Sequence, residues 1–193
     1  RATKASDEYL EEVQEQKKSV VKSSVSKIEY REMQLAGKEL ITENEIEVVV
    51  ENTSVQGKKF RGIKDETYQK YGVRHQFSES TGQVEEQFYP ITKNSEPAGY
   101  KVRVVPKTFY SIGATGKECD LFGQRNFKHG GKNILLSEGE LDCMSAYQML
   151  RDYYEGRGMH YDVPCVSATT GATSYAQIAA QYKFFDMFDS IYV

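Results

Sequence analysis

The first segment of the chain, residues 1–56, is polar and only weakly patterned. A thin apolar seam after Asp7 predicts a helix there, with the aspartate as its cap. Residues 45–51, EIEVVVE, alternate at first and then become continuously apolar, which predicts a single strand. Because no residues with evident chemistry occur in this segment, we expect a polar linker or docking arm.

The second segment, residues 57–115, is predicted to form a helix followed by a small antiparallel sheet. The helix should run from about Lys64 to Tyr71, because Gly72 is a typical residue for ending a helix. Turn-rich stretches separate three strand-like runs. These runs are residues 85–91, 99–105 and 108–112.

The second of these strands alternates between apolar and basic residues. Val102 should face a core together with Val104, since side chains two apart on a strand point the same way. The outward face then carries three cations, provided that Pro106 does not shift the register. They are Lys101, Arg103 and Lys107.

The third segment, residues 116–193, changes from alternation to short apolar runs separated by helical spacing. The predicted order is strand, helix, strand, helix, strand, which is typical of a parallel α/β sheet with right-handed crossovers. The strands are expected at residues 130–137, 163–168 and 189–193, with helices from about Leu141 to Leu150 and from Tyr175 to Phe185. The first two runs lack alternation, so we expect these two strands to be covered on both faces. The chain should stop inside the third strand.

Three carboxylates follow the first strand of this sheet: Glu138, Glu140 and Asp142. Ligands of open parallel sheets bind beyond the carboxyl ends of the strands. Clustered carboxylates at that edge suit Mg²⁺ or Mn²⁺, and Gly139 would let the backbone turn tightly beside a ligand. The alternative is a solvated acidic helix start, which the helix dipole favours.

Composition narrows the class of protein. Apolar residues make up 39% and charged residues 27% of the 193 residues, enough for a core together with a long solvated segment. We find no apolar run of membrane-spanning length and no signal-peptide pattern, so we expect a cytoplasmic protein. The three scattered cysteines argue against a disulfide framework or a zinc ribbon in this chain. The net charge of −3 does not exclude nucleic-acid binding, which needs only a local basic stripe.

Several motifs occur together in one order. SEGELD between a strand and a helix, with VSATTGAT after the next strand, resembles the Toprim fold shared by topoisomerases and primases. RGIKDETYQKYGV resembles the RG(I/L)-x-x-E-T segment upstream of Toprim in primases. From about Phe60 to Val193 the chain resembles the primase region of phage-type bifunctional DNA primase-helicases, to which the mitochondrial Twinkle helicase is related.

This resemblance implies template-directed synthesis of short RNA primers on single-stranded DNA, which is metal-assisted nucleotidyl transfer by a DNA-directed RNA polymerase of the primosome. In that family Glu138 and Asp142 would hold Mg²⁺ or Mn²⁺, two ions in the complete site, and Glu138 could instead act as a base. Lys101 and Lys107 would contact nucleotide phosphates. The strand pattern adds Arg103 to them, and Lys117, in a glycine-containing loop, could touch template or nucleotide.

Parts of the family pattern have no counterpart in the sequence. A D-x-D after the third strand, a zinc module and a helicase domain are all expected in the full-length protein, so we expect this chain to be a monomeric fragment. Two alternatives remain: another Toprim nuclease or topoisomerase-like protein, and a non-catalytic nucleic-acid-binding or docking module.

Overall fold

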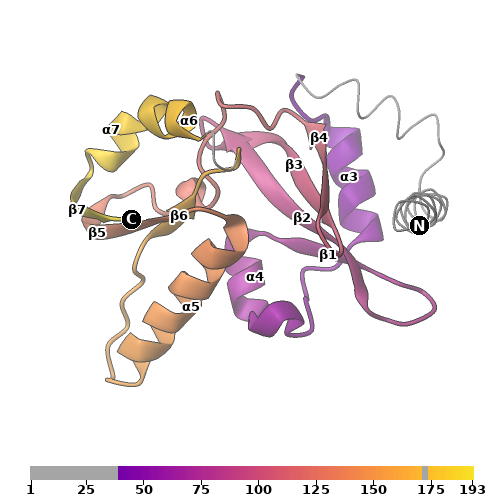
Figure 1. Cartoon of the computed structure of the whole chain (residues 1–193), viewed down its shortest axis with the longest axis horizontal. Helices are drawn as coiled ribbons and strands as arrows, with labels where there is room; N and C mark the ends of the chain where they lie inside the picture. Colours follow the sequence, from indigo (N-terminus) through magenta and orange to yellow (C-terminus); the bar gives the residue numbers. More distant parts are fainter. Residues whose placement is uncertain (1–38, 171–173) are drawn as a thin grey trace, which may run out of the picture. The chain divides into compact units, whose positions relative to one another are not determined.

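Two β-sheets, one antiparallel and one parallel, form the framework of the described residues (Figure 1). The computed structural model describes residues 39–170 and 174–193. The helix predicted after Asp7 lies outside them. In the part of the chain that the model describes, no helix is long and apolar enough to cross a membrane.

Residues predicted to be a strand, 45–51, instead lie in helix α3 (Glu43–Asn52). Thr42 begins the helix with a capping box: its hydroxyl accepts from the Glu45 amide at 3.3 Å, and the Glu45 carboxylate accepts from the Thr42 amide at 2.8 Å. Of the three consecutive valines only Val49 is buried. The cap and this single apolar stripe outweigh the strand propensity of the valines, which is a weak local preference.

Residues around α3 are bonded to the antiparallel sheet. The Ile41 amide donates to the Ala98 carbonyl at 2.9 Å, and Ser54 and His75 exchange two backbone hydrogen bonds of 2.8 and 2.7 Å. The last part of the predicted arm, residues 1–56, is therefore attached to the sheet.

Helix α4 (Asp65–Tyr71) confirms the predicted helix and its end. Gly72 follows in the left-handed region at φ +69°, and its amide donates to carbonyls of the last turn. A one-turn 3₁₀ helix, η1 (Phe60–Gly62), precedes α4.

The antiparallel sheet is a four-stranded meander, β1-β2-β3-β4, which confirms the predicted helix-plus-sheet arrangement and its three strands. The strands are β1 (Arg74–Phe77), β2 (Val84–Lys93), β3 (Glu96–Val104) and β4 (Thr108–Gly113). The four-residue β1 was not predicted. It carries too little alternation to be recognised without its partner strand.

Strand β3 alternates largely as expected. Val102 is fully buried, whereas Val104 is only partly buried. Lys101 and Arg103 point to the other face, where they lie opposite Ser111 and Phe109 of β4. The strand ends at Val104, so Lys107 is an exposed turn residue and not a member of the strand face.

The parallel sheet has the order β6-β5-β7 and confirms the predicted second architecture. Its strands and helices are β5 (Gly131–Ser137), α5 (Glu140–Glu155), β6 (Cys165–Ser167), α6 (Tyr175–Ala180), α7 (Tyr182–Phe185) and β7 (Phe188–Tyr192), and a 3₁₀ turn, η2 (Gln124–Asn126), precedes them. The helix predicted from Tyr175 to Phe185 is thus two short helices. β5 is not covered equally on both faces, since Ile134 and Leu136 are buried but Leu135 is only partly so.

One apolar core serves both sheets. Tyr71 of α4 stacks on Phe122 with ring centroids 5.2 Å apart, and its hydroxyl donates to the Cys165 carbonyl of β6 at 3.0 Å. Tyr89 of β2 and Ile134 of β5 belong to the same cluster. Because β3 is paired with β2, and β4 with β3, the core positions these strands relative to β5 and β6.

Candidate functional site

The predicted acidic turn lies at the carboxyl end of β5. Glu138 and Asp142 flank the start of α5, and both side chains are exposed. The Asp142 carboxylate turns back toward Gly139, where its Oδ2 lies 3.5 Å from the position that a Cβ would take. Within the described residues neither carboxylate forms an ion pair.

Gly139 occupies the predicted turn but not for the predicted reason. Its backbone is extended, with φ −141°, which any residue can adopt. A Cβ there would make only an ordinary contact with Asp142. The glycine adds no side chain beside the two carboxylates, but the backbone conformation of the turn does not require a glycine.

Glu140 differs from its two acidic neighbours because it points inward. Its side chain is 8% exposed, and Lys101 Nζ donates to its Oε1 at 2.7 Å. The same ammonium donates to the Thr169 carbonyl at 2.9 Å, in the loop after β6. Lys101 therefore faces away from Val102 as predicted, yet it reaches the parallel-sheet subdomain instead of bulk solvent.

A cavity of about 270 Å³ lies beside this ion pair. Its lining is mostly hydroxyl-bearing, with one cation and one further aromatic ring: Lys101, Phe109, Tyr110, Ser111, Thr115, Thr169 and Thr170. The Ser111 and Thr115 hydroxyls are 2.8 Å apart and join β4 to the loop that follows it. The cavity thus combines groups that can bind hydroxyls or phosphates with a ring that can stack.

Arg103 lies on the same strand face as Lys101. The Phe109 ring is shared between them, since its centroid is 5.1 Å from the Lys101 ammonium and 5.7 Å from the Arg103 guanidinium. Arg103 also donates to the Pro106 carbonyl at 2.9 Å, which holds it over the β3–β4 turn. The exposed Lys107 belongs to that turn.

Lys117 is exposed in the loop after β4. No described hydrogen bond or ion pair links it to the other predicted site residues. The structure therefore brings Lys101 to the acidic turn through Glu140 and keeps Arg103 beside it on the strand face. It places Lys107 at the end of their hairpin and leaves the role of Lys117 a prediction.

The carboxylates of the acidic turn suit a divalent ion that is also bound by water and substrate better than an ion bound by protein ligands alone. Among the described residues, no three histidine, cysteine, aspartate or glutamate side chains converge as a ready-made site. Mg²⁺, however, commonly takes only one or two carboxylates and completes its shell with water and substrate phosphates. The exposed Glu138 and Asp142 at one helix start fit that second pattern.

A basic turn that was not predicted precedes α4. Lys58, Lys59 and Arg61 are exposed and have left-handed φ angles of +49°, +58° and +53°. Such angles are uncommon outside glycine and persist where the surroundings enforce them. The turn is anchored by the Asp65 carboxylate, which accepts from the Gly57 amide at 2.9 Å, and by the Tyr68 hydroxyl.

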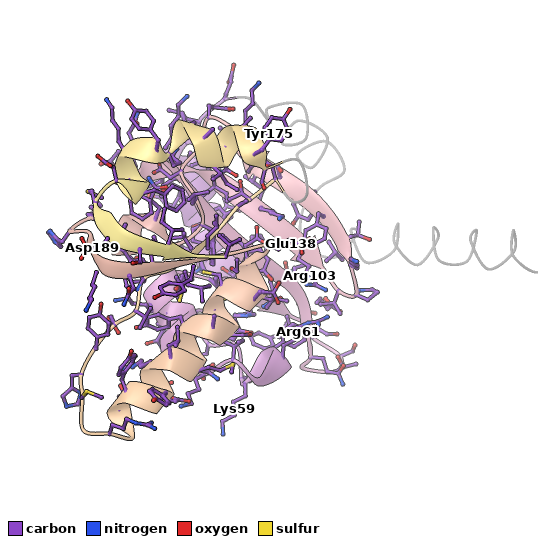
Figure 2. The ribbon with its side chains drawn as sticks, turned by 60° about the vertical axis from the view of Figure 1, so that its left-hand side comes forward. Lys59, Arg61, Arg103, Glu138, Tyr175 and Asp189 are labelled. Carbon is purple, nitrogen blue, oxygen red and sulfur yellow. The ribbon has the colours of Figure 1, made fainter. Side chains whose placement is uncertain are left out.

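The same turn is bonded to α5. Gln148 accepts from the Lys64 amide at 2.7 Å and donates to the Gly62 carbonyl at 3.1 Å, and Lys64 pairs with Asp152 at 2.6 Å. Figure 2 shows Arg103, Arg61 and Lys59 following one another away from Glu138. Three cations within KKFR could have drawn attention in the sequence, but their backbone conformation could not.

Comparison with known proteins gives one consistent relationship, although no family model matches the chain. A DNA helicase/primase of Enterobacteria phage T3 is 29% identical over 136 residues, which are 68% of this chain and 21% of that protein. The chain therefore spans about a fifth of the length of this relative.

Solved structures agree with the sequence comparison. The primase fragment of the bacteriophage T7 primase-helicase has a TM-score of 0.61 and 27% identity, over 80% of this chain and 58% of that one. In a second structure, T7 lagging-strand DNA polymerase interacts with primase domains of two gp4 subunits bound to an RNA/DNA hybrid and dTTP. Its matching chain has a TM-score of 0.58 and 29% identity, over 72% of this chain and 65% of that one.

The match to the T7 primase fragment extends over 80% of the chain, which folds into the two sheets described above. The relation to mitochondrial Twinkle stays a prediction. In sequence and in fold, the chain is similar to the primase region of phage-type DNA primase-helicases.

Proposed function

We propose that the chain is a DNA primase region that adds ribonucleotides to a short primer on a single-stranded DNA template. The observation that carries the proposal is the meeting of β3 with the start of α5. Through Lys101 and Glu140, a strand face bearing cations is bonded to the turn that bears the exposed Glu138 and Asp142. Opposite charges placed in this way suit a reaction between a metal-bound triphosphate and a hydroxyl.

Nucleotide addition is an in-line displacement at the α-phosphate, and positioning with charge neutralisation accounts for most of its catalysis. Lys101 and Arg103 would hold the phosphate oxygens. Glu138 and Asp142 would hold Mg²⁺ or Mn²⁺, one ion or two, which when bound would neutralise charge on the reacting phosphates. Glu138 could alternatively accept the proton of the attacking 3′-hydroxyl.

The template would extend from the acidic turn along α5. The basic turn meets this helix at Gln148, six residues after Asp142, or about 9 Å along the helix axis. Lys58, Lys59 and Arg61 would then contact backbone phosphates, which position a nucleic acid without reading its sequence.

The T3 relative is a helicase/primase, so we expect a helicase portion to act with this region, and a zinc module to recognise the template. The resulting protein would work in the cytoplasm of a phage-infected cell. The chain itself would be a monomer.

The test is template-dependent incorporation of labelled ribonucleotides with Mg²⁺ or Mn²⁺, comparing the wild type with Glu138→Gln. We expect the variant to lose roughly 100-fold or more in rate, because it removes charge needed in the transition state. The matched control is Glu155→Gln, at the far end of α5, where an exposed ion pair with Arg151 should matter little.

Binding supplies a second readout that does not need the complete reaction. Equilibrium dialysis with ATP and Mg²⁺ should show weaker nucleotide binding in Glu138→Gln than in Glu155→Gln. If both variants incorporate and bind ribonucleotides like the wild type, the acidic turn is only a solvated helix start and the proposal is wrong.

A further inference from the structure

The pairing of Glu140 with Lys101 is unusual among the ion pairs of the described residues because both partners are largely buried. The Lys101 side chain is 20% and the Glu140 side chain 8% exposed, whereas the partners of the other ion pairs are 31% to 49% exposed. Burying two charges carries a desolvation cost that a pair repays only with close geometry and further hydrogen bonds. A buried pair of this kind contributes little net stability, which points to a functional role.

We propose that Glu140 is a positioning residue: it holds the Lys101 ammonium at the hydroxyl-lined cavity so that the ammonium can bind a phosphate of the incoming ribonucleotide. This inference rests on the function proposed above. It separates Glu140 from Glu138 and Asp142, which would act on the metal.

The donor count of the ammonium supports the assignment. A lysine ammonium has three N–H donors. One is used by Glu140 at 2.7 Å and a second by the Thr169 carbonyl at 2.9 Å. Among the described residues no hydrogen bond uses the remaining donor, which leaves it for a ligand in the cavity that Lys101 lines. These two hydrogen bonds, together with the Phe109 ring 5.1 Å from the ammonium, hold the long Lys101 side chain in one position.

The origins of these contacts explain why a carboxylate is needed. Lys101 belongs to β3, Glu140 to the first turn of α5, and Thr169 to the loop after β6. Neutral Thr169 alone would leave a mostly buried cation without a counter-charge. Glu140 supplies that charge from the first turn of α5, which also carries Asp142 and directly follows Glu138, so one helix start would hold both the phosphate and the metal.

The experiment measures ATP binding in the presence of Mg²⁺ by equilibrium dialysis for Glu140→Gln, Lys101→Met and the double variant. We expect Glu140→Gln, which keeps the shape and an acceptor oxygen, to weaken binding by roughly tenfold or more. If Glu140 acts through Lys101, its substitution should add nothing in the Lys101→Met background. Where primer synthesis is measurable, KM for the nucleotide should rise more than kcat falls.

Controls separate positioning from folding. Asp162→Asn breaks another ion pair, with Lys70 at 2.9 Å, and should leave ATP affinity unchanged. Glu140→Asp keeps the charge but withdraws it by one methylene, so an affinity between those of wild type and Glu140→Gln is expected. Circular dichroism and thermal melting of each variant show whether it is folded, and binding is compared per folded molecule.

The outcomes also separate this inference from the proposed function. If Lys101→Met weakens ATP binding but Glu140→Gln stays within twofold of wild type, the positioning role fails and the proposed function stands. The positioning role also fails if the losses of ATP affinity of the two single variants multiply in the double variant, because Glu140 would then act independently of Lys101. If Lys101→Met itself binds ATP normally, the proposed nucleotide contact fails and the inference with it.

Discussion

At the scale of single residues, surroundings decide what a side chain can do. Glu138, Glu140 and Asp142 are spaced by two, yet the first and last are exposed whereas the middle one is buried against Lys101. Helix geometry explains this difference in exposure only in part. α5 begins at Glu140, and it is β3, packed beside this helix start, that buries the Glu140 side chain. Residue type alone would have assigned all three the same role.

His75 shows the same dependence on surroundings and gives a pH prediction. It is fully buried, its Nε2 lies 3.2 Å from the Gln87 amide nitrogen, and burial lowers its pKa from 6.5 to about 4. In the unfolded chain the ring binds a proton below about pH 6.5, whereas the folded protein binds it only near pH 4. Stability should therefore fall as the pH drops from 6.5 toward 4, by about 2 kcal/mol at pH 5.

Urea unfolding of the wild type and of His75→Phe at pH 7.5 and pH 5 checks this prediction. The phenylalanine keeps a ring against Tyr68 but cannot titrate, so the variant should be less sensitive to pH over this range even if it is less stable throughout. An equal loss of stability in both proteins would assign the pH dependence to other groups.

At the scale of elements, the ends of helices depend on backbone conformation that the sequence reveals unevenly. Gly72 ends α4 at φ +69°, as its position in the sequence indicated. Gly139 begins α5 with extended backbone, although its place in EGE suggested a tight turn. Two glycines that look alike in the sequence thus meet different physical demands.

Alanine substitutions should separate these two glycines. Gly72→Ala should lower the free energy of unfolding by about 1 kcal/mol, because a Cβ disfavours the left-handed region. Gly139→Ala should change it by less than about 0.5 kcal/mol, since its backbone is unstrained and its Cβ would meet Asp142 at an ordinary 3.5 Å. Urea unfolding measures both, and equal effects would contradict this assignment.

At the scale of the described unit, one core joins the two sheets and should make them unfold together. Tyr71 contributes to this coupling twice, through its stacking on Phe122 and its hydrogen bond to Cys165 of β6. The same core keeps Lys101 of β3 within bonding distance of Glu140, so loss of one sheet should also dismantle the site.

Cooperative unfolding can be followed because the chain has no tryptophan. A tryptophan introduced in place of Phe88 on β2 or of Tyr153 on α5 would be the sole reporter of its own subdomain. Both variants should show fluorescence transitions that coincide with their own circular-dichroism transition in urea. Separate midpoints for the two probes within one variant would show that the sheets unfold independently.

Much of the fold was predictable because it is encoded by local patterns. Strand-like runs between turn-rich stretches identified β2, β3 and β4, and the glycine after Tyr71 marked the end of α4. Short apolar runs identified β5 and β6, and the alternating order of strands and helices extended to β7. Residues 45–51 were predicted wrongly, because the Thr42 capping box and burial of Val49 override the strand propensity of a valine run.

Apart from α3 and β1, the sequence by itself determined the order of strands and helices, the two kinds of sheet, and the placement of Glu138 and Asp142 at a strand's carboxyl end. Spacing between neighbours is enough for these, since backbone periodicity is local. The tertiary structure alone decided that Glu140 is buried against Lys101, 39 residues earlier in the chain, and that a strained basic turn is bonded to α5. Both contacts arise because a shared core brings together segments that are distant in the sequence, and such packing cannot be predicted from local patterns.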